Sequence, residues 1–71
     1  MGWDTAYENA RRLFVNATSY DDMNAKSRTL KQAWNAAYGL PTDYYGRDDL
    51  LRDIENYAYR CGIDLSKVSG Y

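Results

Sequence analysis

The chain has 71 residues, with nine basic and ten acidic side chains, a formal net charge of −1 and no histidine. This length allows a single domain over residues 1–71, and its core is small because such a chain removes only about 60% of its unfolded surface from water. Cys61 is the only cysteine, which excludes a disulfide within the chain and leaves a tetrahedral zinc site without enough ligands, so we expect no metal or other cofactor.

Residues 4–17 are predicted to form the first helix. Asp4 is expected to be its N-cap, because a carboxylate at that position can accept a hydrogen bond from an unpaired amide of the first turn. Val15 lies opposite the apolar face and is expected to be exposed. The apolar face at helical spacing comprises Ala6, Tyr7, Ala10, Leu13, Phe14 and Ala17.

Residues 20–38 are predicted to form the second helix. Ser19 and Asp22 resemble a capping box, with aspartate in place of the usual glutamate or glutamine. Gly39 suits the left-handed position after a helix, where Leu40 can fold back onto the last turn. The inward-facing residues are expected to be Met23, Ser27, Leu30, Trp34, Ala37 and Tyr38, with Ala33 at the edge.

Residues 48–61 are predicted to form the third helix, and Gly62 followed by Ile63 repeats the stop signal of the second. Short extra turns are expected near 42–46 and 64–68. No segment shows the alternating pattern of a strand. The predicted fold is therefore all-α, a compact bundle of three main helices with short connections. The inner face of the third helix is expected to comprise Leu50, Leu51, Ile54, Tyr57, Ala58 and Cys61.

The residues that usually carry catalysis are missing or badly placed. Histidine, which titrates most readily near neutral pH, is absent. Cys61 lies on a predicted inner face and is interpreted as a buried structural cysteine. No glycine-rich phosphate loop or calcium-binding loop is present. We therefore expect a protein that is not an enzyme.

Tyrosine is unusually abundant, with eight in the chain. Tyr7, Tyr38 and Tyr57 fall on inward faces, whereas Tyr59 points away from the apolar face of its helix. The exposed rings could simply cover the ends of a thin core, or they could bind a partner, because tyrosine is enriched at protein interfaces. Asp48 and Asp49 lie where a helix begins, which favours a capping role for them, and a role on a partner surface is the alternative. The candidate partner-binding residues are Asp43, Tyr44, Tyr45, Asp48, Asp49, Arg52, Asn56 and Tyr59.

These features predict a module that binds another protein. The overall character is similar to that of many small proteins of phages and mobile elements, which often inhibit a host enzyme or a defence complex by occupying its surface. In such a role the rings would fill pockets and the carboxylates would pair with basic residues. A second copy of the chain could also cover Val15, giving a homodimer.

The alternative is a small nucleic-acid-binding regulator. Residues 1–42 carry five basic and four acidic side chains, and residues 43–71 carry four basic and six acidic ones, so neither half has a dense positive field. No stretch approaches the roughly 18–20 apolar residues that span a membrane, and the start resembles no signal peptide, so we expect a cytoplasmic protein. The basic residues of this alternative surface are Arg11, Arg12, Arg28 and Lys31.

Overall fold

The computed structural model describes residues 2–68, which contain three α-helices and no strand. The helices are α1 (Asp4–Ser19), α2 (Met23–Tyr38) and α3 (Arg47–Cys61), followed by a short 3-10 helix, η1 (Leu65–Lys67). The predicted all-α fold is therefore confirmed, including the extra turn near 64–68. None of the helices in this part of the chain is long and apolar enough to cross a membrane.

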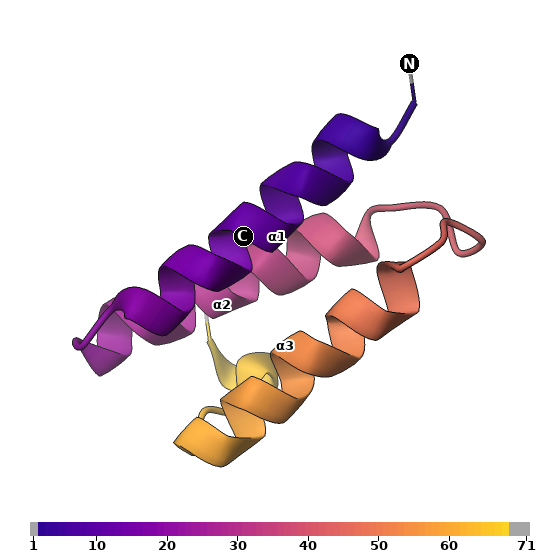
Figure 1. Ribbon diagram of the computed structural model, residues 1–71. Helices are drawn as coiled ribbons and strands as arrows, with labels where there is room; N and C mark the ends of the chain where they lie inside the picture. Colours follow the sequence, from indigo (N-terminus) through magenta and orange to yellow (C-terminus); the bar gives the residue numbers. More distant parts are fainter. Residues whose placement is uncertain (1, 69–71) are drawn as a thin grey trace.

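Helix α2 is the centre of the bundle. It lies antiparallel to α1 along most of its length and contacts α3 on another side, whereas α1 and α3 touch each other little (Figure 1). The segment that contains η1 returns after α3 and packs on α2. This arrangement leaves a groove between α2, α3 and the returning segment.

The core is thin because most of its buried residues are alanines. Among residues 2–68, only Leu30 and Ile54 are large side chains that are fully buried. Partly buried aromatic rings enclose this core; Phe14 and Tyr57, for example, pack edge to face with ring centroids 5.9 Å apart. Aromatic side chains thus supply much of the packing that a chain of this length needs. The buried cluster comprises Ala10, Ala17, Leu30, Ala33, Ala37, Leu50, Ile54 and Ala58.

The connection between α1 and α2 lies later in the chain than the sequence predicts, at residues 20–22 instead of 18–19. Helix α1 continues to Ser19, whose hydroxyl donates a 2.7 Å hydrogen bond to the carbonyl of Asn16. Helix α2 begins only at Met23, because Asp22 is its N-cap and accepts a 2.9 Å hydrogen bond from the amide of Ala25. The predicted capping box from Ser19 is wrong, since Asp22 caps the helix by itself.

Two further predictions at helix ends are wrong. Trp3 occupies the N-cap position of α1, and Asp4 is the first helical residue. Gly39 has φ −73°, a right-handed conformation, although Leu40 does fold back and is buried as expected. Gly62 does adopt the left-handed conformation, with φ 75°.

Several side chains lie further out than their helical positions predict. Tyr38 is 58% exposed and Met23 is 47% exposed, because each lies at an end of α2, beyond the buried centre of the bundle. Cys61, the last residue of α3, is only partly buried. Val15 is exposed, as predicted.

The connection from α2 to α3 consists of turns rather than a helical turn. The amide of Tyr44 donates to the carbonyl of Pro41 over 3.0 Å, and the amide of Arg47 donates to the carbonyl of Tyr44 over 3.1 Å. Gly46 follows with φ 94°, a conformation that disfavours any other residue. These turns direct the two tyrosines of the connection to different surroundings.

Candidate functional site

The outer face of α3 brings together five of the eight predicted site residues. Asp49, Arg52, Asn56 and Tyr59 are three, four and three positions apart, so they form one stripe along the helix. All four are exposed, as is the neighbouring Asp48. With a rise of about 1.5 Å per residue, the stripe is roughly 15 Å long. Within it, Arg52 and Asp49 form a 3.4 Å ion pair.

The three predicted site residues in the connection before α3 differ in exposure. Tyr45 is 95% exposed and Asp43 is also exposed. Tyr44 is partly buried, because its ring packs against that of Tyr7, with centroids 5.4 Å apart. Its hydroxyl donates a 2.6 Å hydrogen bond to Oδ1 of Asp4. Tyr44 therefore holds the connection against α1, and the structure does not bring it to the exposed face of α3.

The hydrogen bond to Asp4 also changes the acidity of the Tyr44 phenol. It raises the pKa of Tyr44 from 10.0 to about 12, with smaller contributions from burial and from the charge of Asp4. Ionisation would break the bond and place a phenolate beside a carboxylate. Tyr44 thus stays protonated as part of a structural contact.

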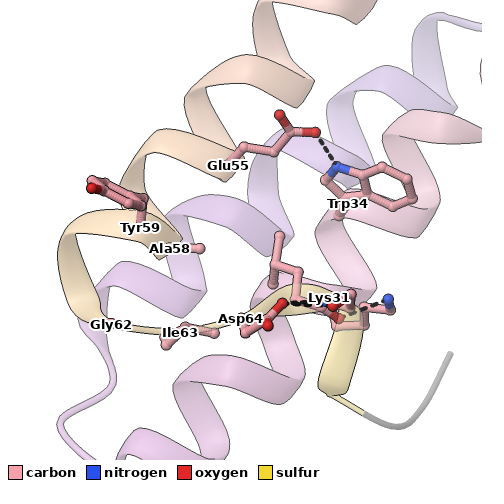
Figure 2. A pocket seen from close by; sticks show the side chains of 10 residues that line it. Lys31, Trp34, Glu55, Ala58, Tyr59, Gly62, Ile63 and Asp64 are labelled. Carbon is pink, nitrogen blue, oxygen red and sulfur yellow. Dashed lines mark hydrogen bonds between the residues drawn. The ribbon is translucent and has the colours of Figure 1, made fainter.

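A groove that the sequence analysis missed lies between α2, α3 and the segment that contains η1 (Figure 2). Its volume is about 640 Å³, and Tyr59 of the α3 stripe contributes to its lining. Trp34 enters from α2, and Ile63 and Leu65 enter from the returning segment. The Gly62–Ile63 stop signal predicts that the chain turns here, but no local pattern shows where the returning segment packs. The full lining comprises Lys31, Trp34, Glu55, Ala58, Tyr59, Gly62, Ile63, Asp64, Leu65 and Ser66.

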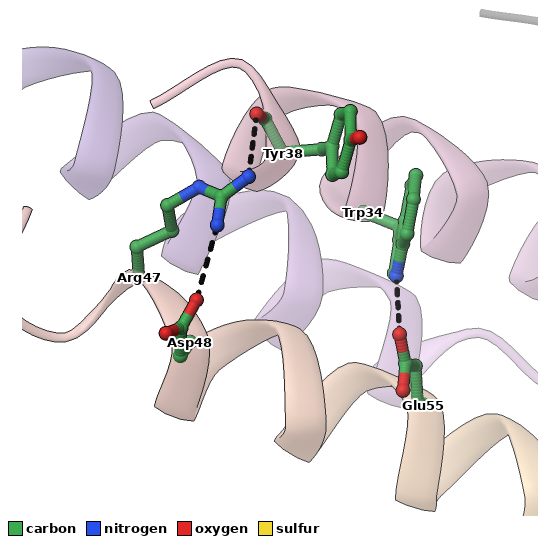
Figure 3. A network of polar contacts seen from close by, with 5 residues as sticks. All are labelled: Trp34, Tyr38, Arg47, Asp48 and Glu55. Carbon is green, nitrogen blue, oxygen red and sulfur yellow. Dashed lines mark hydrogen bonds and ion pairs between the residues drawn. The ribbon is translucent and has the colours of Figure 1, made fainter. Parts of the chain in front are cut away.

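Polar contacts hold the walls of the groove in place. The indole nitrogen of Trp34 donates a 2.9 Å hydrogen bond to Oε2 of Glu55, which links α2 to α3 (Figures 2 and 3). The ammonium of Lys31 donates a 2.9 Å hydrogen bond to the carbonyl of Leu65. Asp64 accepts bonds from both the hydroxyl and the amide of Ser66, which lower the pKa of its carboxyl and keep it ionised.

A ladder of aromatic and basic side chains continues from the groove along α2. The rings of Trp34 and Tyr38 are stacked, with centroids 4.9 Å apart and planes 10° apart. The guanidinium of Arg47 lies 5.1 Å from the Tyr38 ring and donates to the carbonyl of Tyr38 and to Asp48 (Figure 3). Arg47 is 8% exposed, although nothing in the sequence distinguishes it from the exposed arginines. This ladder anchors the start of α3 to the end of α2.

The basic residues of the alternative nucleic-acid surface are only partly available. Arg11, Arg12 and Arg28 are exposed. Lys31 is bound to the carbonyl of Leu65, and its ammonium lies 5.8 Å from the Trp34 ring. One of the four cations is therefore committed to an internal contact. Within residues 2–68, no three histidine, cysteine, aspartate or glutamate side chains come together to hold a metal ion.

Comparison of the chain with protein-family models, with curated proteins and with solved structures finds no match. The chemistry and geometry of the chain's own residues are therefore what bears on its function.

Proposed function

We propose that this chain is a protein-binding module whose contact surface includes the α3 face, defined as Tyr45, Asp48, Asp49, Arg52, Asn56 and Tyr59. The observation that carries this proposal is the exposure of Tyr45 and Tyr59, which are 95% and 85% accessible. Tyr59 is the last residue of the polar stripe on α3, and Tyr45 lies in the connection two residues before that helix begins. Tyrosine at such positions offers large contact area and a polar tip at low entropic cost, and it is enriched where proteins bind one another.

Binding to this face is steric and electrostatic in our proposal. The two rings enter pockets on the partner, and the carboxylates of Asp48 and Asp49 pair with basic residues at its surface. The specific form of the function that we propose is inhibition of a host enzyme or defence complex in the cytoplasm, as carried out by small phage and mobile-element proteins. The short chain and the acidic, aromatic face suit occlusion of a basic surface on such a partner.

The α3 face is smaller than a complete interface. A standard protein–protein interface buries about 800 Å² on each partner and involves about 20–30 residues a side. That area corresponds to roughly one sixth of the 4796 Å² accessible surface of this domain. Six residues do not supply it, so the contact must extend onto neighbouring surface. The groove that shares Tyr59 is the adjoining surface with apolar walls.

The proposal is tested by capture of a partner from a lysate of the cells in which the protein acts, with the mass of the complex measured. The wild type should retain the partner, and the double variant Tyr45→Ala, Tyr59→Ala should lose it. Tyr20→Ala is the matched control, because Tyr20 is also exposed but lies in the α1–α2 connection.

All three proteins should unfold at closely similar temperatures, since surface substitutions usually change stability by less than about 0.5 kcal/mol. Equal capture by the wild type and the double variant would refute the α3 face as the contact. Capture of nucleic acid that weakens steeply with salt, and that needs Arg11, Arg12 and Arg28, would instead support the alternative function.

A further inference from the structure

The groove beside the α3 face is lined largely by apolar side chains. Its lining comes from three separate elements, namely from Trp34, Tyr59 and Leu65, together with Ile63 between α3 and η1. Figure 2 shows Trp34 and Tyr59 on opposite sides of the groove. Its volume of about 640 Å³ lies within the range of roughly 300–1,000 Å³ that is usual for ligand sites. An apolar hollow of this size on a small domain is a place where an apolar group of a partner can leave water.

The groove is already formed before any partner arrives. Trp34 is oriented by its bond to Glu55, and Lys31 fastens the returning segment through the Leu65 carbonyl. At the end of α3, the amide of Ile63 donates to the carbonyl of Ala58 over 2.8 Å, and this bond fixes the turn at Gly62. A binding site held in this way loses little conformational entropy when it is filled.

The lining of the groove carries more acidic than basic side chains. Its two acids are Glu55 and Asp64. The single cation of the lining, Lys31, already donates to a carbonyl and lies beside the Trp34 ring. A carboxylate offers about four acceptor positions, so Glu55 can accept further hydrogen bonds besides that from Trp34.

We infer that this groove binds an extended segment of the partner protein in which a bulky apolar side chain neighbours an arginine or lysine. The apolar side chain fills the space among Trp34, Ile63 and Leu65, and the basic side chain pairs with Glu55 and Asp64. This inference rests on the proposed function and specifies the chemistry of the partner. The two carboxylates of the lining favour a basic segment over an acidic one, because the one ammonium of the lining already donates to the Leu65 carbonyl.

Random twelve-residue peptides displayed for selection provide the probe. Peptides retained by the wild-type protein should share a leucine, isoleucine, methionine or aromatic residue within two positions of an arginine or lysine. The most enriched peptide, once synthesised, should shift the indole resonance of Trp34 and the amide resonances of residues 62–66 in NMR spectra. Replacing its apolar residue by alanine should weaken binding about tenfold or more.

Conservative variants of the two acids test the electrostatic half of the inference. Glu55→Gln and Asp64→Asn keep an oxygen that can accept from Trp34 and Ser66, so the groove should stay intact while its charge is lost. Each change should weaken binding of the basic peptide about two- to fivefold at low salt. Asp53→Asn is the matched control, because Asp53 is exposed on α3 but does not line the groove.

The outcomes separate this inference from the proposed function. The groove assignment would be overturned if no peptides were recovered or if the recovered peptides lacked basic residues. It would also be overturned if a bound peptide changed protein resonances away from residues 62–66. The α3 face would still stand if partner capture were lost in Tyr45→Ala. Conversely, a peptide that binds the groove, combined with partner capture that is unchanged in Tyr45→Ala and Asp49→Asn, would keep the groove and refute the α3 face.

Discussion

The hydroxyl of Tyr44 donates a 2.6 Å hydrogen bond to Oδ1 of Asp4, a residue 40 positions earlier in the chain. This bond fastens the connection between α2 and α3 to the first turn of α1. The Tyr7 ring packs beside Tyr44, and a β-carbon added to Gly46 would lie only 3.0 Å from the Tyr7 hydroxyl. One end of the bundle is therefore closed by two tyrosines, an aspartate and a glycine.

We expect Tyr44→Phe to lower the unfolding temperature at neutral pH, because it removes the hydrogen bond and keeps the ring. The pKa of Tyr44 is raised from 10.0 to about 12 in the folded state. The stabilisation contributed by the Tyr44 hydroxyl is therefore fully present below pH 10 and is lost as the pH rises toward 12. The difference in unfolding temperature between wild type and variant should shrink across that window. In a titration by ultraviolet absorbance, the variant should lack the phenol that ionises near pH 12.

Tyr45→Phe is the matched control for this experiment. It removes the same hydroxyl from a ring that is 95% exposed, so the unfolding temperature should hardly change. Equal unfolding temperatures for the two variants at neutral pH would contradict a stabilising role for the bond between Tyr44 and Asp4.

The contrast between Tyr44 and Tyr45 shows where sequence reasoning reaches its limit. Both residues precede Gly46, and local sequence gives no reason to separate them, so both are predicted to bind a partner. Their difference depends on Asp4, which only the tertiary fold brings near. By contrast, the stripe that includes Asp49 and Tyr59 could be predicted, because it follows from the geometry of a single helix.

The groove and the buried position of Arg47 depend in the same way on long-range packing. The apolar periodicity predicts each of the three helices, and the break around Pro41 predicts their separation. The short connections predict that α2 packs beside both neighbours, but no pattern predicts that the segment after Gly62 returns to α2. The lining of the groove therefore comes from residues that show no common pattern in the sequence.

Replacing the glycine after α3 and the glycine after α2 should have opposite effects on stability. Gly62 has φ 75°, where a β-carbon is strained, so Gly62→Ala should destabilise the protein by about 1 kcal/mol. Gly39 has φ −73°, and an added β-carbon would meet only carbonyl oxygens at 3.6 Å. Gly39→Ala should therefore stabilise the protein by about 0.4–1 kcal/mol, by reducing the entropy of the unfolded chain.

Thermal unfolding followed by circular dichroism measures the change in stability of both variants.

The sequence predicts one conformation for the two glycines, since each precedes a bulky apolar residue at a helix end. After α3, the amide of Ile63 bonds back to the carbonyl of Ala58 and requires the left-handed turn. After α2, Leu40 bonds to Ala37 instead. Destabilisation of similar size in both variants would show that Gly39 also needs its conformational freedom.

The alanine-rich core makes the two large side chains that are fully buried, Leu30 and Ile54, especially important. Leu30→Ala should cost about 2–5 kcal/mol, because Leu30 is fully buried. A domain of 71 residues is stabilised by roughly 4–11 kcal/mol in total, at 0.05–0.15 kcal/mol per residue. Leu30→Ala should thus unfold at a much lower urea concentration than the wild type. Val15→Ala, at a position 60% exposed, should change the midpoint little; a large shift there would indicate that Val15 is covered, as in a dimer.

Burial should also separate the two arginine–aspartate pairs of α3 in their contribution to stability. Arg47 is 3.0 Å from Asp48, and Arg52 is 3.4 Å from Asp49. The Arg52 side chain is 66% exposed, whereas that of Arg47 is 10% exposed and also donates to the carbonyl of Tyr38. Exposed pairs contribute about 0–1 kcal/mol, while a hydrogen bond from a charged group contributes about 1.5–3 kcal/mol.

We therefore expect Arg47→Ala to destabilise the protein by about 2–3 kcal/mol in urea unfolding, and Arg52→Ala by less than about 1 kcal/mol. Arg47→Lys should fall between them, because an ammonium cannot span Asp48 and the Tyr38 carbonyl as a planar guanidinium does. Part of the stabilisation that Arg47 contributes is offset, because its buried Nε has no hydrogen-bond partner among residues 2–68. Equal losses of unfolding free energy in Arg47→Ala and Arg52→Ala would show that burial of the Arg47 guanidinium contributes nothing to stability. In that case the contacts from Trp34 through Tyr38 to Arg47 would not hold the start of α3 against α2.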